Sequence, residues 1–485
     1  MFFNSIDFAI YLPIVFILYW FVTSKNLKSQ NFLIVLASYV FYGWWDWRFL
    51  LLIIFSSVID FVIGQKLRTS ENLNRRKVLL WISIIVNLGF LGFFKYYNFF
   101  LDNFITAFSL LGKDIQPNSL NIILPVGISF YTFQTLSYTI DVYKRKLEPT
   151  NDFIAFSAFV SFFPQLVAGP IERATHLLPQ FYKKRKFDYK LAVDGTRQIL
   201  WGLFKKVIIA DNCAEYANLI FDNSADMGGI NLVLGALFFT FQIYGDFSGY
   251  SDIAIGTSRL FGFDLMQNFA FPYFSRNIAE FWRRWHISLS TWFRDYLYIP
   301  LGGSRGNLLS KIRNIFIIFV VSGFWHGANW NFIVWGALNA FYFLPILLAK
   351  KNRNYLDVVA EGKITPSMKE LFSILLTFGL TVFAWIFFRA ENLKHAIEYI
   401  STIFSKSIFI LPKGSDFLST TLHPFNIILL IGVFILMEWK GREGQHAFSH
   451  LDSWKKPFRY LIYYGIIAAI ICLSAKEQEF IYFQF

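Results

Sequence analysis

Cysteine and charge are both scarce in this sequence of 485 residues. The only two cysteines are Cys213 and Cys472, which are too few for a disulfide framework or a cysteine-ligated zinc site. Charged residues make up 16% of the chain, whereas a soluble globular protein carries about 25%. The sequence also lacks the HExxH, Walker A and GxGxxG motifs, which disfavours metalloproteases, P-loop ATPases and dinucleotide-binding enzymes. We therefore expect no metal site and no bound cofactor.

Apolar residues are abundant instead. They make up 55% of the chain, and 60 of the 485 residues are phenylalanine. Because a helix needs roughly 20 apolar residues to cross a bilayer, this composition predicts an all-α membrane protein with about 10–12 membrane helices. The clearest predicted spans lie near residues 6–23, 31–45, 49–64, 78–95, 121–140, 314–325, 328–349, 371–388, 425–439 and 458–474, and apolar segments of less certain depth lie at 153–169 and 229–256.

The net charge of +13 follows the membrane topology and does not indicate a nucleic-acid-binding face. Lysines and arginines gather in the short loops 24–30 and 65–77, and again at 350–369 and 440–459. Within each pair of loops two predicted spans intervene, so the positive-inside rule places these loops in the cytoplasm. The N- and C-termini are then expected outside it, in a multi-pass protein of the cytoplasmic (inner) membrane. No positive charge precedes the first apolar segment, so we expect that segment to be retained and not cleaved.

Two regions do not fit simple membrane crossings, one near residues 147–200 and one near 268–304. Both mix aromatic side chains with charged ones, which is too polar for a helix facing lipid. We predict re-entrant or interfacial helices around a cavity, because irregular backbone at membrane depth must be surrounded by protein or a water-filled space. Without an internal repeat or linker, residues 1–485 are expected to form a single transmembrane domain.

The first polar cluster inside an apolar stretch is SGFWHGANWN at 322–331. If the preceding residues are helical, His326 lies about 20 Å from the basic interface. Imidazole titrates near neutral pH and suits general-base catalysis, and Trp325 and Asn329 are the supporting residues beside it. A buried histidine that only bonds to a neighbouring helix is an equally good interpretation of the pattern alone.

Two further clusters stand out. Residues 281–290, FWRRWHISLS, carry His286 between aromatic residues. Their Arg283 and Arg284 suit either an interfacial helix or the phosphate of an acyl donor. In the otherwise apolar segment 242–252, Asp246 is expected either to orient a catalytic histidine or to balance an arginine from 276–294.

Several long motifs resemble the membrane-bound O-acyltransferase (MBOAT) family, and within it the alginate O-acetyltransferase branch. They are ILPVGISFYTFQTLSYTIDVY at 123–143, FFPQLVAGPIER at 162–173, YGDFSGYSDIAIG at 244–256, FWRRWHISLSTWFRDYLYIPLGG at 281–303 and SGFWHGANWNFIVWG at 322–336. The resemblance implies a helical fold around a central funnel or tunnel. It maps the family's essential histidine onto His326 and its second histidine onto His286.

The resemblance also implies a reaction. The acyl donor is a cytoplasmic thioester, either acetyl-CoA or an acyl carrier, and the acetyl group passes outward to an exported, alginate-like polysaccharide, with a periplasmic hydrolase-like acetyltransferase as partner. His326 is expected to deprotonate the acceptor hydroxyl, and either His286 or Asn329 to stabilise the oxyanion. Two alternatives remain open at this point: D-alanyl transfer to teichoic acid, whose enzymes share most of these motifs, and a transporter or flippase without chemistry.

Overall fold

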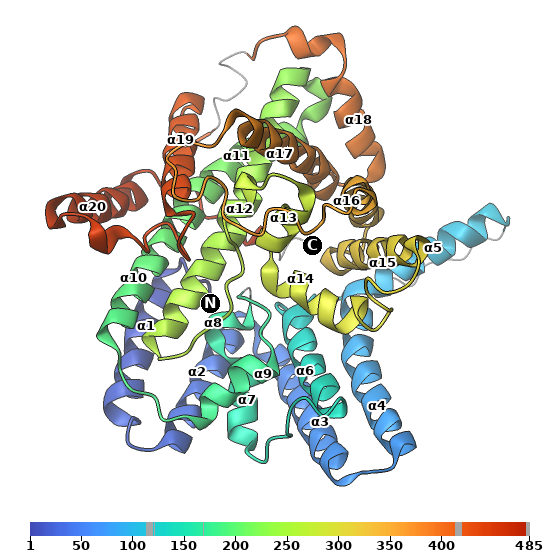
Figure 1. The fold of residues 1–485 in the computed structure, drawn as a ribbon, viewed down its shortest axis with the longest axis vertical. Helices are drawn as coiled ribbons and strands as arrows, with labels where there is room; N and C mark the ends of the chain where they lie inside the picture. The colour runs from blue at the N-terminus through green and yellow to red at the C-terminus, as the bar shows by residue number, and fades with distance from the viewer. Residues whose placement is uncertain (113–119, 121, 168, 413–419, 482–485) are drawn as a thin grey trace. The chain divides into compact units, whose positions relative to one another are not determined.

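The protein is built from helices, as Figure 1 shows. The computed structural model describes residues 1–485 except 113–119, 121, 168, 413–419 and 482–485, and the described part contains no β-strand. Residues 121 and 168, which fall in two of the predicted apolar segments, therefore lie outside the described residues. Seven helical stretches are long and apolar enough to cross a membrane within the described ranges: 27–69, 73–110, 229–260, 308–326, 330–348, 368–389 and 424–441. The prediction of an all-α polytopic protein is confirmed.

Most of the expected spans coincide with helices, and several of these helices have clear capping residues. The principal ones are α2 (Leu27–Asp46), α3 (Leu50–Thr69), α4 (Leu73–Leu91), α12 (Gly229–Leu260), α15 (Leu308–His326), α16 (Trp330–Leu348), α17 (Met368–Arg389) and α19 (Pro424–Gly441). A capping box of Ser367 and Glu370 begins α17, and the Asn307 side chain accepts a hydrogen bond from the Ser310 amide at the start of α15. Three further apolar helices are shorter: α1 (Ile6–Ile17), α6 (Ile128–Tyr143) and α20 (Lys456–Cys472).

The chain folds into two compact units. The first comprises residues 1–192 and 257–266, and the second comprises 193–256 and 267–485. In the first unit, α3 packs against α4 and α6, and the region after residue 150 is broken into the short helices α7 (Phe153–Ser161), α8 (Phe163–Leu166) and α9 (Ala174–Leu177). The second unit contains every candidate site residue. The single-domain organisation stays a prediction.

In the second unit, α15 and α16 lie side by side (Figure 1) because glycines let their backbones approach. A Cβ placed on Gly323 would meet the Phe332 carbonyl oxygen at 2.1 Å, and one on Gly336 would meet the Phe319 carbonyl oxygen at 2.3 Å. Any side chain at these positions would force the helices apart. Gly323 therefore allows the close approach of α16 to the end of α15 that carries His326.

The GxxxG pair on α12 has the same effect. Gly245 and Gly249 face the segment formed by α10 (Tyr189–Leu203) and the π-helical turn η5 (Phe204–Ala210). A Cβ on Gly249 would lie 2.8 Å from the Gly202 carbonyl oxygen, and one on Gly245 would lie 2.9 Å from that of Lys205. This contact brings the lysines of η5 against the acidic face of α12.

Candidate active site

His326 is the last residue of α15 and lies in an aromatic box. Its ring centroid is 5.0 Å from that of Trp325, 5.3 Å from Trp335 and 5.4 Å from Phe388. The helix stops there because Gly327 is extended and Asn329 then caps α16 by accepting a hydrogen bond from the Asn331 amide at 3.1 Å. His326 is 3% exposed. The break between the two helices therefore places an imidazole at the end of a rigid helix and inside the protein.

His286 lies in the tight bend between the seven-residue helices α13 (Ile278–Arg284) and α14 (Ile287–Phe293). Its φ angle is 43°, in the left-handed region that few residues other than glycine adopt. Buried polar groups hold it there. The Asn268 side-chain oxygen lies 3.0 Å from His286 Nδ1 and accepts a hydrogen bond from the Ser288 hydroxyl at 2.8 Å.

Asn268 is a site residue that the sequence analysis missed. It is completely buried, its amide nitrogen donates to the Ser251 hydroxyl at 3.0 Å, and its backbone carbonyl accepts from the Ile287 amide at 2.9 Å. These bonds of Asn268 join α12 to the bend at His286. The only signal in the sequence is an asparagine inside the apolar run LMQNFAF at 265–271.

The contacts of Asn268 also define the protonation of His286. An amide oxygen can only accept hydrogen bonds, so its bond with the imidazole requires that Nδ1 carries the hydrogen. Burial lowers the pKa of His286 to about 3, so the ring is neutral at physiological pH. Its Nε2 atom therefore presents a lone pair, and His286 in this state accepts hydrogen bonds there and does not donate them.

The structure brings the two histidines together around one tryptophan. The Trp325 ring centroid is 6.2 Å from that of His286 and 5.0 Å from that of His326. Trp335 and Trp385, stacked at 5.5 Å, continue the aromatic wall beyond His326. Trp325 is thus the common neighbour of two imidazoles that are 40 residues apart in the sequence, a juxtaposition that no local pattern contains.

Asn329 is held by structural contacts. Besides capping α16, its amide nitrogen donates to the Glu391 carbonyl oxygen at 2.9 Å. Both ends of the side chain therefore have partners in the turn that follows His326, and its contacts secure that turn.

Asp246 has a cationic partner, but that partner is neither a histidine nor an arginine. Lys206 Nζ lies 2.8 Å from an Asp246 oxygen and also 2.8 Å from Asp211, and the Ile481 amide donates to the second Asp246 oxygen at 2.6 Å. All three charged side chains are almost completely buried. The acid therefore compensates a buried lysine and holds the segment around Ile481 against α12.

The two arginines expected at the donor site have different surroundings. Arg284 forms an ion pair with Glu280 at 2.9 Å and donates to the Asp357 carbonyl oxygen. Arg283 also donates to backbone carbonyl oxygens, including that of Asn352 at 2.8 Å, but it lines a cavity of about 280 Å³.

This cavity is lined both by arginines and by α15, which it reaches one helical turn before His326, and we refer to it as the cavity below His326. Arg283 and Arg294 both line it, and so does Ser322, which lies one helical turn before His326 on α15. Arg294 pairs with the neighbouring Asp295, and the arginine side chain is more than half exposed. Arg294 is therefore better placed than Arg284 to meet an anionic ligand.

Comparison with known proteins identifies the family. The family model for the membrane-bound O-acyltransferases matches residues 143–387, which include both histidines. The chain belongs to the membrane-bound O-acyltransferase family. It is therefore an O-acyltransferase, it requires an acyl donor as substrate, and as a member with several apolar spans it is a multi-pass membrane protein.

The relatives extend over most of the chain. A probable alginate O-acetylase, AlgI, of Pseudomonas aeruginosa is 41% identical over 84% of this chain and 75% of its own. The peptidoglycan O-acetyltransferase of Helicobacter pylori is 33% identical over 98% of this chain and 95% of its own. The teichoic acid D-alanyltransferase of Bacillus subtilis is 28% identical over 57% of this chain and 71% of its own. The expected resemblance to the alginate O-acetylase branch is confirmed.

Proposed function

We propose that this acyltransferase moves an acetyl group from a cytoplasmic thioester donor, acetyl-CoA or an acyl carrier, toward an exported alginate-like polysaccharide. The observation that carries this proposal is the pair of buried imidazoles around Trp325, next to a cavity lined by two arginines. Two relatives named as acetylating enzymes cover most of the chain, whereas the D-alanyltransferase matches 57% of it. Acetyl transfer is therefore the better supported reaction.

The donor is expected to use the cavity below His326. Guanidinium groups bind phosphate through charge-assisted hydrogen bonds, and Arg283 and Arg294 provide such groups among otherwise largely apolar walls. A phosphate-bearing donor held there would direct its thioester past Ser322 toward the aromatic box. Arg284 contributes indirectly, because its pairing with Glu280 helps to fix α13, from which Arg283 projects.

The chemical step needs a base. His326 removes the proton of the acceptor hydroxyl as its oxygen attacks the thioester carbonyl carbon, and the C–O bond forms. The C–S bond then breaks, and the departing sulfur takes up the proton that His326 holds. His286 presents a lone pair on Nε2, so it suits accepting a hydrogen bond from the acceptor hydroxyl and orienting it. Stabilising the oxyanion would require Nε2 to donate a hydrogen bond, which only the protonated ring can do.

The surroundings of the reaction follow from topology and from the relatives' names. Basic loops on one side of the spans favour a cytoplasmic-membrane protein with both termini outside the cytoplasm. The acceptor is then reached from the outer side, and a periplasmic hydrolase-like partner would complete transfer to the polymer. Relatives named for alginate and for peptidoglycan leave both polymers as acceptors to be compared.

The decisive experiment compares His326→Ala with His450→Ala, which alters an exposed histidine of the same unit. Membranes containing each variant receive radiolabelled acetyl-CoA or an acetylated carrier, and polymer-bound acetate is measured. We expect His326→Ala to lower transfer at least ~100-fold and to leave the amount of folded protein unchanged, with His450→Ala like the wild type. Normal acetylation by His326→Ala would refute the proposal. Polymer labelling from a labelled D-alanyl carrier, with none from the acetyl donors, would show that the transferred group is D-alanine and not acetate.

A further inference from the structure

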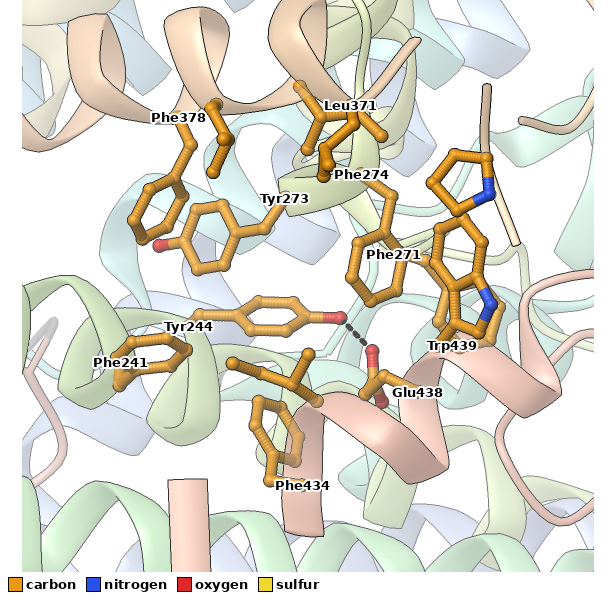
Figure 2. Close-up of a pocket in the computed structure, with 14 residues that line it drawn as sticks. Phe241, Tyr244, Phe271, Tyr273, Phe274, Leu371, Phe378, Phe434, Glu438 and Trp439 are labelled. Atoms are coloured by element: carbon orange, nitrogen blue, oxygen red, sulfur yellow. Dashed lines mark hydrogen bonds between the residues drawn. The ribbon is translucent and has the colours of Figure 1, made fainter. Parts of the chain in front are cut away.

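A second cavity of about 350 Å³ lies in the second unit and shares no lining residue with the arginine-lined one. Figure 2 shows the residues that line it. Its walls come from α12, the short turn η7 (Pro272–Phe274), α17 and α19. Aromatic rings dominate them, among them Phe241, Tyr244, Tyr273, Phe378, Phe434 and Trp439. The exception is Glu438, whose carboxylate is already occupied by the Tyr244 hydroxyl at 2.5 Å and the Trp201 ring nitrogen at 3.0 Å. The space therefore suits hydrocarbon and offers water few partners.

The mouth of the cavity opens between two membrane spans. The floor residues Tyr244 and Phe434 are 3% and 1% exposed, whereas Leu375 on α17 and Ile435 on α19 are 59% and 38% exposed. Both of these helices are long and apolar enough to cross the bilayer. The exposed edge of the cavity therefore faces the region that lipid chains occupy.

The same mouth has a basic border. Leu371 lies in the first turn of α17 and Trp439 in the last turn of α19, so the cavity is at the ends of both helices. Lys369 and Lys440 are exposed at those two ends. A ligand that enters with an apolar chain would leave its polar headgroup at the helix ends that carry Lys369 and Lys440. The Lys440 ammonium also lies over the Trp454 ring, 5.0 Å from its centroid.

We propose that this cavity binds one acyl chain of an anionic bilayer phospholipid, whose phosphate pairs with Lys369 and Lys440. The aromatic lining suits hydrocarbon because it offers water few hydrogen-bond partners. Lysines next to a membrane span attract anionic lipids. The acyl chain of the lipid would rest on Tyr244. The ring centroid of Tyr244 is 4.9 Å from that of Tyr273 and 5.9 Å from that of Trp285, which precedes His286 in the sequence. The lipid thus packs against the aromatic layer that supports the active-site bend.

The test is photocrosslinking of the full-length protein in vesicles of phosphatidylethanolamine and phosphatidylglycerol. A trace of phosphatidylglycerol carries a diazirine in its acyl chain, and labelled peptides are mapped by mass spectrometry. Ile435→Trp fills the mouth, and Leu436→Trp adds the same indole to a neighbouring residue of α19 that is 65% exposed and does not line the cavity. We expect at least a fivefold loss of label on Tyr244 and Ile374 peptides with Ile435→Trp, and none with Leu436→Trp.

A second arm tests the headgroup. In the wild type, excess unlabelled phosphatidylglycerol should reduce the labelling more than the same excess of phosphatidylcholine. Replacing both Lys369 and Lys440 by alanine should remove this difference between the two competitors. Equal labelling of the Ile435→Trp and Leu436→Trp proteins would overturn the proposal, and so would displacement by a polyprenyl phosphate but not by phosphatidylglycerol. Labelling needs no acetyl transfer, so His326→Ala should be labelled like the wild type whether or not the proposed reaction is correct.

Discussion

Two histidines in the two units have opposite surroundings. His176, in the first unit, lies between Glu172, 2.7 Å from Nδ1, and Asp264, 3.5 Å from Nε2. The carboxylates of Asp264 and Glu172 raise the pKa of His176 to about 10, so its ring is charged. His286, in the second unit, has the neutral Asn268 side chain as its partner, and burial lowers its pKa to about 3. The chemistry of the partner and the depth of burial decide which imidazole is charged and which is neutral.

The two residues also act on stability in opposite pH ranges. The folded-state pKa of His176 is raised above its ordinary value near 6.5, so its stabilisation is complete below that pH and is lost as pH rises through about 10. The folded-state pKa of His286 is depressed, so its contribution is present above pH 6.5 and is lost as pH falls toward about 3. A charged, half-exposed histidine serves structure, whereas a buried neutral one is available for catalysis.

The largest expected effect separates the two histidines by function. Asparagine tolerates the left-handed backbone of residue 286, so His286→Asn removes the imidazole and keeps the bend. Because His286 is proposed to orient the acceptor hydroxyl, we expect acetyl transfer by His286→Asn to fall at least ~100-fold, and transfer by His176→Asn to equal the wild type. Initial rates in membranes with matched protein amounts provide the measurement. Equal rates for the two variants would remove the functional distinction between these residues.

A second change should make His286 resemble His176. Asn268→Asp puts a carboxylate beside Nδ1 and should raise the pKa of His286, keeping the ring charged. Transfer at pH 7 should then drop roughly tenfold and recover as pH rises. Ser288→Ala is the control, since it removes a bond to the same Asn268 oxygen and adds no charge. A pH–rate profile of Asn268→Asp that overlays the wild-type profile would contradict the role given to Asn268.

The smallest expected effect is on stability. Glu172 is fully buried and accepts from both His176 and the Met266 amide. Glu172→Gln removes its charge, so we expect about 1–3 kcal/mol less stability at pH 7 and unchanged acetyl transfer. Thermal unfolding in detergent, followed by tryptophan fluorescence, measures the difference. Because His176 loses its charge above pH 10, the difference in stability between Glu172→Gln and the wild type should become smaller there. A difference that does not change with pH would indicate that the variant loses packing and not an ion pair.

The sequence predicted the helices well because lipid imposes a simple rule on them. Runs of apolar residues such as 371–388 and 425–439 had to be helices, since the bilayer offers backbone groups no other partner, and α17 and α19 extend only a few residues beyond them. His286 and His326 stood out for the same reason, as ionisable groups within apolar surroundings. The partners of buried polar residues were harder to predict from the sequence. Asp246 had several candidate cations within reach of the expected fold, and only close packing at Gly245 and Gly249 brings Lys206 to it.

The composition and order of residues in this chain determined that it is a helical membrane protein and which two imidazoles are the candidates for catalysis, because hydrophobicity and the cost of buried charge are properties of short segments. The tertiary structure alone decided that Trp325 is a neighbour of both histidines, that Asn268 is the neutral partner of His286, and that Arg294 and not Arg284 lines the cavity below His326. These relations join side chains that are distant in sequence, and they arise only when helices pack, because packing sets the distances and the exclusion of water on which hydrogen bonding and protonation depend.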